Sequence, residues 1–457
     1  MMLLQLLPAS LRKYVTMSRR ERKHEIQSTL WYMPLLYVSL SVFLVVFALF
    51  LDIQLDIERQ LPPIVSITAE TTQMLVSTLI GGILTLSAFT LNSLLVVLTT
   101  FSGQFSPRML LNFVADRRTQ HALGVFNGSF VYVLLVFLFI GSTERENFAA
   151  VPITTIFLAF LTAMTFIYFI NHATTWMQVH NITNTMKENS QRIIKDTLSR
   201  ELEVYRAETS GDMKLEYEED TVRVQAKKSG YVQLVDYRKM LEQARRDDII
   251  VQFHRRMGEY VLAGNELFSY WGPGAENVEM DDYSRMVQIG HKELELQDLQ
   301  MGMYKLSEIA IKSIGNKDPK TAMTTMHQMA ELMLEVVEYI TFTPYLQDEN
   351  RQTRIVLMAE SFESYLYKGF GFIRHYAEDD HVLLTELINC MAKIAESLDE
   401  TKQETIWAFA SDIFRHQSPD HMYRLDLTFM LESLQVLSRI TDSEEEFKQI
   451  EERMQPV

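Results

Sequence analysis

Four long apolar runs stand out in the first part of the chain. They cover residues 31–51, 73–101, 122–140 and 151–170, and none of them contains a charged side chain. A helix of about 20 apolar residues is long enough to cross the hydrocarbon core of a bilayer. The pattern therefore predicts four transmembrane helices that form a membrane domain over residues 31–171.

The second apolar run, residues 73–101, is unusually polar for a membrane span. Hydroxyl or amide side chains recur at every seventh position, at Thr71, Thr78, Thr85, Asn92 and Thr99. This spacing places them on one gently coiling face of a helix. Neighbouring positions are kept small by Gly81, Gly82, Ser87 and Ala88. A helix facing lipid gains nothing from such a stripe, so we expect another helix or water to meet it.

Two interpretations of this stripe stay open. In the first, it is a packing surface, because small and hydroxyl-bearing residues let membrane helices approach, at about 1 kcal/mol or less per contact. In the second, the stripe is a pore wall, and Phe89 and Val96 on the same face are a candidate gate that closes by dewetting. The wall would offer ions neutral oxygens and an amide from Thr78, Thr85, Asn92 and Thr99. Absence of charge favours a weakly selective or gated path over a proton-coupled carrier.

Charged residues alternate in sign between the spans. Residues 1–30 are basic, and the link after the second span carries Arg108, Arg117 and Arg118, whereas residues 52–70 contain four acids and one base. The positive-inside rule then places both termini in the cytoplasm of a multi-pass protein of the bacterial inner membrane. The first apolar run is too long for a cleavable signal peptide.

The rest of the chain is predicted to be cytoplasmic and to fold in three parts. Residues 172–220 continue the fourth helical pattern and predict a stalk helix, whereas residues 221–275 are β-rich, with a helical insertion at 237–246, and predict a small β-sandwich or barrel. Residues 276–457 predict a helical domain with breaks near 315–319, 343–348, 377–380, 399–401 and 419. The expected fold class is a mostly α membrane protein with a small β-domain and an all-α cytoplasmic domain.

Composition excludes several classes of function. The formal charge of −16 argues against nucleic-acid binding. A single cysteine, Cys390, excludes an intrachain disulfide and a zinc site built on several cysteines. The sequence has no GxSxG, HExxH or P-loop motif. We therefore expect no enzymatic activity, no cofactor and no metal.

Smaller patterns favour structural roles. His172 and His180 are too far apart in sequence for the usual metal-ligand pair, and an interfacial structural role is expected. His375 and His381 bracket an acidic turn, for which a solvated loop is more common than a metal site. The methionine stripe of the helical region is typical of a core, at Met323, Met326, Met329 and Met333.

Several stretches resemble a family of predicted bacterial membrane proteins known as domain of unknown function twenty-two fifty-four. They include SGQFSPRMLLNFVADRRTQHALGVFNGSFVYVLL, IYFINHATTWMQV, SGYVQLVD, GEYVLAGNELF and LSEIAIKSIGNKDPKTA. Here the last of them has a shorter turn than the family's Ser-Pro-Gly-Ile-Asn-Asp-Pro-like sequence, with Lys317 before Asp318. The resemblance implies the membrane topology and carries no activity.

The β-rich segments resemble the two halves of a biotinyl/lipoyl-type barrel-sandwich. Gly230, Gly258 and Gly264 stand where such domains need positive φ or close backbone approach. The modifiable lysine turn is replaced by the helical insertion, so a rigid adaptor without covalent cofactor is expected.

The leading functional hypothesis is a homo-oligomeric channel or channel-like pore lined by the second span, with a cytoplasmic regulatory body. Its expected partners are further copies of itself, the lipid bilayer and inorganic ions. The alternative is a membrane-anchored scaffold or sensor whose cytoplasmic domain binds a protein partner, and it requires the polar stripe to be buried between helices of one chain.

Overall fold

The computed structural model describes residues 32–60, 62, 66–104, 116–141, 145–176, 178–199, 202–210, 221–291, 293, 299–378, 380–415 and 417–454. The chain divides into two compact units, Met1–Gln178 and Val179–Val457. The basic segment 1–30 and Arg108 lie outside the described residues.

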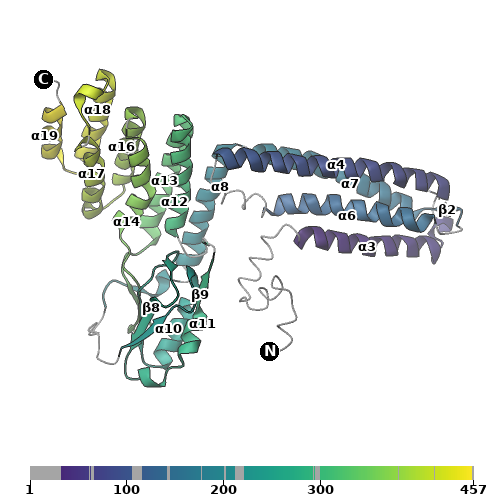
Figure 1. Ribbon diagram of the computed structural model, residues 1–457, viewed down its shortest axis with the longest axis horizontal. Coiled ribbons are helices and arrows are strands. Elements are labelled where there is room, and N and C mark those ends of the chain that lie inside the picture. Colours follow the sequence, from purple (N-terminus) through teal and green to yellow (C-terminus); the bar gives the residue numbers. More distant parts are fainter. Residues whose placement is uncertain are drawn as a thin grey trace. The chain divides into compact units, whose positions relative to one another are not determined.

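Four helices of the described first unit are long and apolar enough to cross a membrane, as predicted. They are α3 (Tyr32–Ile53), α4 (Ala69–Gln104), α6 (Arg117–Ile140) and α7 (Ala150–Trp176), which lie side by side in Figure 1. Half of the most apolar window of α6 is buried (50%), against 17%, 17% and 22% for α3, α4 and α7. The central helix of the unit is therefore α6, and the other three pack around it.

Two glycines allow α3 and α6 to approach closely. A Cβ atom added to Gly124 would lie 2.4 Å from the Tyr37 ring, and one added to Gly128 would lie 2.8 Å from Ser41 Oγ and 3.1 Å from the backbone oxygen of Tyr37. Small residues four apart are a common contact surface of membrane helices. Within this unit, the small residues that let two helices approach are therefore Gly124 and Gly128 of α6, facing α3.

The links that join α3 to α4 and α6 to α7 meet at one end of the unit. Strand β1 (Ile67–Thr68) pairs antiparallel with β2 (Asn147–Phe148). Arg145 Nη2 lies 2.8 Å from Asp56 Oδ1 and 3.5 Å from Glu58 Oε2. Both predicted outer links therefore lie at the same end of the unit. This is required of two links that are separated by two spans, α4 and α6.

A buried carboxylate holds the start of α7. Asp52, at the end of α3, is fully buried. Its Oδ1 accepts hydrogen bonds from the N–H groups of Ala149 (3.1 Å) and Ala150 (2.8 Å), and its Oδ2 accepts one from Val151 (2.9 Å). The first N–H groups of a helix have no partner within the helix and carry the positive end of its dipole. Asp52 supplies both acceptor and charge from a different helix.

The predicted stalk over residues 172–220 is not one continuous helix. Helix α7 ends at Trp176, and α8 (Val179–Arg192) continues into a π-helical turn, η4 (Ile193–Leu198). In the second unit α8 packs on α12 (Leu299–Gly315) and α13 (Pro319–Tyr339). Lys187 Nζ of α8 lies 2.5 Å from Glu331 Oε2 of α13, and a Cβ added to Gly302 of α12 would clash with Ser190 Oγ of α8. Tertiary packing therefore places this amphipathic segment against the helical body.

The β-region takes strands from far outside the predicted range 221–275. A six-stranded sheet has the order β3 (Arg206–Ala207), β10 (Tyr345–Gln347), β11 (Thr353–Val356), β6 (Ile250–Phe253), β8 (Glu266–Trp271) and β4 (Val222–Gln225). A second sheet has the order β7 (Tyr260–Val261), β5 (Gly230–Val235) and β9 (Val287–Gly290). Residues 276–457 are therefore not all helical, because β9, β10 and β11 complete these sheets.

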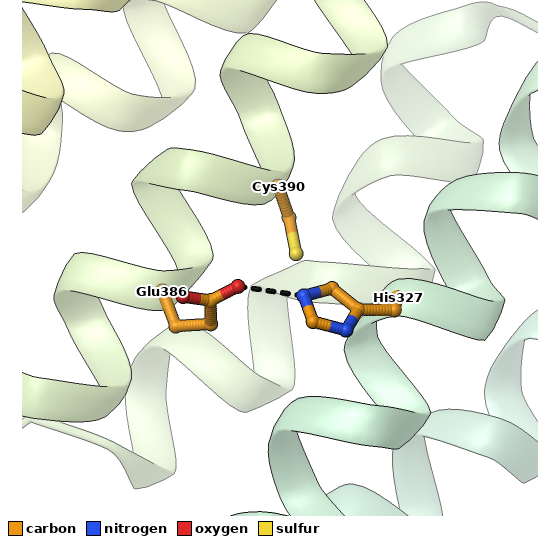
Figure 2. Close-up of side chains that lie close together, drawn as sticks. All are labelled: His327, Glu386 and Cys390. Atoms are coloured by element: carbon orange, nitrogen blue, oxygen red, sulfur yellow. Dashed lines mark hydrogen bonds and ion pairs between the residues drawn. The ribbon is translucent and has the colours of Figure 1, made fainter.

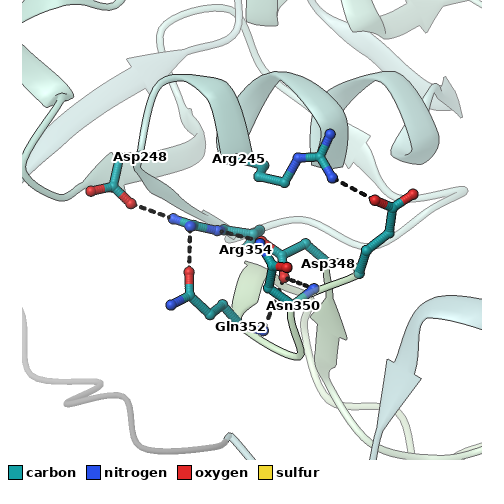
Figure 3. A network of polar contacts seen from close by, with 7 residues as sticks. Arg245, Asp248, Asp348, Asn350, Gln352 and Arg354 are labelled. Atoms are coloured by element: carbon teal, nitrogen blue, oxygen red, sulfur yellow. Dashed lines mark hydrogen bonds and ion pairs between the residues drawn. The ribbon is translucent and has the colours of Figure 1, made fainter.

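Arg354 on β11 links segments of the six-stranded sheet that are far apart in the sequence (Figure 3). Its guanidinium donates to Asp348 Oδ2 (3.0 Å) and to Asp248 Oδ1 (2.8 Å), and only 8% of the residue is exposed. Burial alone would raise the pKa of Asp348, but the N–H groups of Gln352 and Asn350 and the guanidinium outweigh burial and lower it. The network ties the turn after β10 to the turn before β6.

The remaining helices begin and end close to the predicted breaks. They are α10 (Tyr237–Arg246), α11 (Met280–Met286), α12 (Leu299–Gly315), α14 (Phe362–Leu366), α15 (Phe372–Tyr376), α16 (His381–Ala395), α17 (Glu400–Arg415), α18 (Arg424–Ile440) and α19 (Glu444–Met454). Asp318 caps α13 by accepting from the N–H of Thr321 (3.2 Å), after Lys317 takes a left-handed φ of 57°. Met326, Met329 and Met333 are buried, which confirms a core role for these three methionines of the stripe, whereas Met323 is only half-buried.

Candidate functional site

The polar stripe of α4 lies on the outside of its own four-helix unit. Thr71, Thr78, Thr85, Asn92 and Thr99 are all exposed, whereas Val76, Ile83, Leu94 and Val97 of the same helix are buried against its neighbours. A Cβ atom added to Gly81 or Gly82 would meet nothing within 4 Å. The stripe is therefore not a packing surface within one chain.

The hydroxyl groups of the stripe donate inward, to their own helix. Thr78 Oγ1 donates to the backbone oxygen of Met74 (2.9 Å), Thr85 Oγ1 to that of Gly81 (2.8 Å), and Thr99 Oγ1 to that of Val96 (2.9 Å). A hydroxyl that donates its proton keeps two lone pairs as acceptors. The outer face of α4 therefore presents acceptor oxygens and no charge along its membrane-spanning length.

The two candidate gate residues share this exposed face. Phe89 is 53% exposed and Val96 is 50% exposed. The Phe89 ring is steadied by an edge-on contact with Phe166 of α7, with 5.7 Å between ring centroids. The structure thus brings Phe89 and Val96 onto the face of the stripe, as predicted, and adds Phe166 as a support that the sequence did not indicate.

A second, apolar strip runs beside the polar one on α4. Leu84 (53%), Leu91 (50%) and Leu95 (58%) are as exposed as the gate residues. The same helix therefore offers two exposed surfaces at the same depth, one of leucines suited to lipid and one of oxygens and an amide. Two adjacent residues, such as Leu84 and Thr85, therefore place one side chain on each surface.

At the opposite end from β1 and β2, a histidine and an aspartate join α6 to α7. His172 Nε2 lies 2.5 Å from Asp116 Oδ2, and His172 is buried with its ring stacked 6.2 Å from that of Tyr168. Tyr37 OH lies 3.0 Å from His121 Nδ1 nearby in the bundle, linking α3 to α6. These contacts support the structural role expected for His172.

Three metal-ligand side chains come together in the helical body (Figure 2). His327 lies on α13, and Glu386 and Cys390 lie one helical turn apart on α16. Their ligand atoms all lie within 4.8 Å of one another, and His327 Nε2 is 2.6 Å from Glu386 Oε1. Among the described residues no other group of three such donors is found. No spacing in the sequence relates His327 to Glu386 and Cys390, which lie about 60 residues further along the chain.

Among the residues that the structure describes, the histidines that bracket the acidic turn join no comparable group of three. The His375 ring stands edge-on to Tyr376, and His381 Nε2 lies 3.2 Å from Gln417 Oε1. Asp379 lies outside the described residues. His381 instead begins α16, whose first turn is capped by Asp380.

The β-region keeps the paired halves of the predicted domain without closing a barrel. Gly230, Gly258 and Gly264 have φ of 155°, 76° and 87°, which confirms the backbone role predicted for these glycines. Strand β5 pairs with β7, and α10 stands between β5 and β6 in the chain, where the helical insertion was predicted. The described strands of the β-region form two open sheets, so the barrel-sandwich resemblance is not confirmed.

Comparison with known proteins finds uncharacterized mycobacterial relatives. The Uncharacterized protein Rv1290c of Mycobacterium tuberculosis (strain H37Rv) is 27% identical over 321 residues, which cover 65% of this chain and 58% of that protein. The Uncharacterized protein Mb1321c of Mycobacterium bovis matches to the same extent. The chain thus spans about 58% of the length of these curated relatives. No solved structure matches it.

A family described as a predicted membrane protein, DUF2254, matches residues 27–393. The match includes the four apolar helices, the sheet region, and the helices that carry His327 and Cys390. It confirms the family resemblance found in the sequence. The chain therefore belongs to the DUF2254 family of predicted membrane proteins.

Proposed function

We propose that this protein forms a homo-oligomeric, channel-like pore whose wall is the polar stripe of α4. The observation that carries the proposal is the exposure of this stripe on the outside of its own bundle. In an oligomer closed around an axis, the stripes of several chains converge and face water. The proposed role is not enzymatic, and the partners are other copies of the chain, the bilayer and inorganic ions.

The chemistry of the stripe supports a weakly selective path for cations. Outward lone pairs of Thr78 and Thr85 would replace part of an ion's hydration shell, and the Asn92 amide offers both a donor and an acceptor. Without a charged group in the span, such a wall binds ions weakly and releases them easily. Phe89 and Val96 would set the barrier to wetting.

Matched cysteine pairs on α4 test the proposal directly. In a Cys390→Ser background, we expect Thr85→Cys and Asn92→Cys to react with a charged, membrane-impermeant thiol reagent, because thiolates form only where water reaches them. Leu84→Cys and Leu91→Cys sit at the same depths and are also at exposed positions of the single chain, yet they should stay unmodified in lipid. Equal protection of all four positions in the assembled protein would contradict a water-filled wall.

We also propose an inner-membrane location with both termini in the cytoplasm. The alternation of charge and the meeting of the two outer links at β1 and β2 support this topology. In intact cells carrying Cys390→Ser, a cysteine at exposed Arg59 should be labelled from outside, and one at exposed Lys320 only after the cells are opened. The reverse pattern would invert the topology.

The alternative, a membrane-anchored scaffold or sensor, is favoured by a different surface. Helix α18 and the residue before it carry large exposed apolar side chains, at Tyr423 (82%), Leu425 (63%), Phe429 (56%) and Val436 (50%). Exposed apolar patches of this kind mark interaction surfaces. The exposure of the α4 stripe weighs against that version of the alternative in which the stripe is buried within one chain.

A further inference from the structure

We propose that His327, Glu386 and Cys390 form a binding site for a divalent cation of the zinc class, which links α13 to α16. The inference is independent of the pore. It rests on the nature of the three donors, on their spacing and on the access of solvent to one side of the group (Figure 2).

The donor set suits zinc. Imidazole nitrogen, carboxylate oxygen and cysteine sulfur are the three protein ligands that zinc uses, and catalytic or exchangeable sites leave a fourth position to water. Magnesium and calcium prefer oxygen ligands and would not use the cysteine. Zinc bound to a thiolate and a carboxylate gives a site with no net charge, which lowers the cost of its partial burial.

The spacing needs only a small adjustment. Ligand atoms around a tetrahedral zinc ion lie roughly 3–4 Å apart, given bonds of about 2.0–2.3 Å. Here all three lie within 4.8 Å, with His327 and Glu386 joined at 2.6 Å. The ion would enter by parting this hydrogen bond and drawing in the sulfur. The His327 side chain is 44% exposed, so it can move and leaves a path to solvent.

Neighbouring groups hold the carboxylate in place. Asn389 Nδ2 donates to Glu386 Oε2 (3.4 Å), and Lys393 Nζ lies 3.8 Å from Glu386 Oε1. Such outer partners orient metal ligands. Burial, and then the charge of Glu386, raise the pKa of the Cys390 thiol to about 12, so without metal the sulfur keeps its proton. Zinc binding replaces that proton, which passes to the buffer, and forms the metal–sulfur bond.

Cobalt and zinc binding to the full-length protein tests the site. The protein is purified in detergent without a histidine tag, stripped with a chelator and titrated with each metal. We expect one bound ion per chain. Cobalt should give a near-ultraviolet thiolate band, and because the chain has a single cysteine, only Cys390 can supply it. Zinc should also raise the melting temperature of the wild type.

Two variants and one control make the result decisive. Cys390→Ser should abolish the cobalt band, and His327→Gln, at a half-exposed position that tolerates substitution, should weaken zinc by more than the ~10–100-fold typical of losing an outer partner. The control, His381→Gln, changes a histidine of α16 that lies outside the group, and this variant should bind zinc as the wild type does. The proposal is overturned if the wild type gives no band, or if both ligand variants bind zinc unchanged.

Discussion

Phe89→Ser is expected to raise the ion leak of vesicles that contain the protein. Phe89 lies on the uncharged, exposed stripe of α4, where an apolar ring from each chain would repel water from the axis. Exposing a phenylalanine-sized apolar group to water costs about 1.5–3 kcal/mol, and its removal therefore changes the wetted population by about ten- to a hundredfold. The measurement is ion flux into reconstituted vesicles, with the assembly checked in detergent.

Two further variants give this test its controls. Phe160→Ser makes the same chemical change at a side chain of α7 that is 61% exposed, and it should leave the vesicles tight. Asn92→Leu removes the amide from the stripe and should lower flux while the oligomer persists. If vesicles with assembled Phe89→Ser protein are as tight as empty ones, α4 lines no path, and the scaffold interpretation is the better one.

Asp52→Ala is expected to destabilise the membrane unit by about 2–4 kcal/mol, because three N–H groups at the start of α7 lose a charged acceptor in a largely buried setting. All three donors, at Ala149, Ala150 and Val151, lie within 3.1 Å of the carboxylate. Asp52→Asn keeps one acceptor oxygen without the charge, and its stability should lie between those of the wild type and Asp52→Ala. Thermal unfolding in detergent gives the order of stability.

The matched control is Glu58→Ala in the link that follows α3. Glu58 pairs with Arg145 at 3.5 Å in a more open setting, and such a pair contributes about 0–1 kcal/mol. Coinciding melting curves for Asp52→Ala and Glu58→Ala would mean that the start of α7 does not depend on the Asp52 carboxylate.

Features that depend on local pattern were predicted well. The spans, the helix ends and the insertion at Tyr237–Arg246 follow from apolar periodicity and from residues such as Asp318, which caps a helix directly ahead of Pro319. The seven-residue spacing of Thr78, Thr85 and Asn92 likewise guaranteed a shared face. The sequence left open whether that face pointed into the bundle, because this depends on where α6 and α7 pack.

Features that join distant segments were missed. Strand β11 pairs in parallel with β6, with Ile355 opposite Val251, and the sequence of neither strand identifies the other as its partner. The range 276–457 was therefore predicted as helical throughout. The predicted continuous stalk was wrong for a related reason: its sequence contains no helix breaker near Gln178, but the tertiary structure ends α7 at Trp176 and packs α8 on α12 and α13.

The amino-acid sequence by itself determined that this is a four-span helical membrane protein with an uncharged polar stripe, because bilayer thickness and helical pitch act on residues close together in the chain. Only the tertiary structure decided that the stripe faces outward, that Asp52 caps a helix about a hundred residues later, and that His327 meets Glu386 and Cys390. Such meetings depend on how whole elements pack, and no local spacing encodes them.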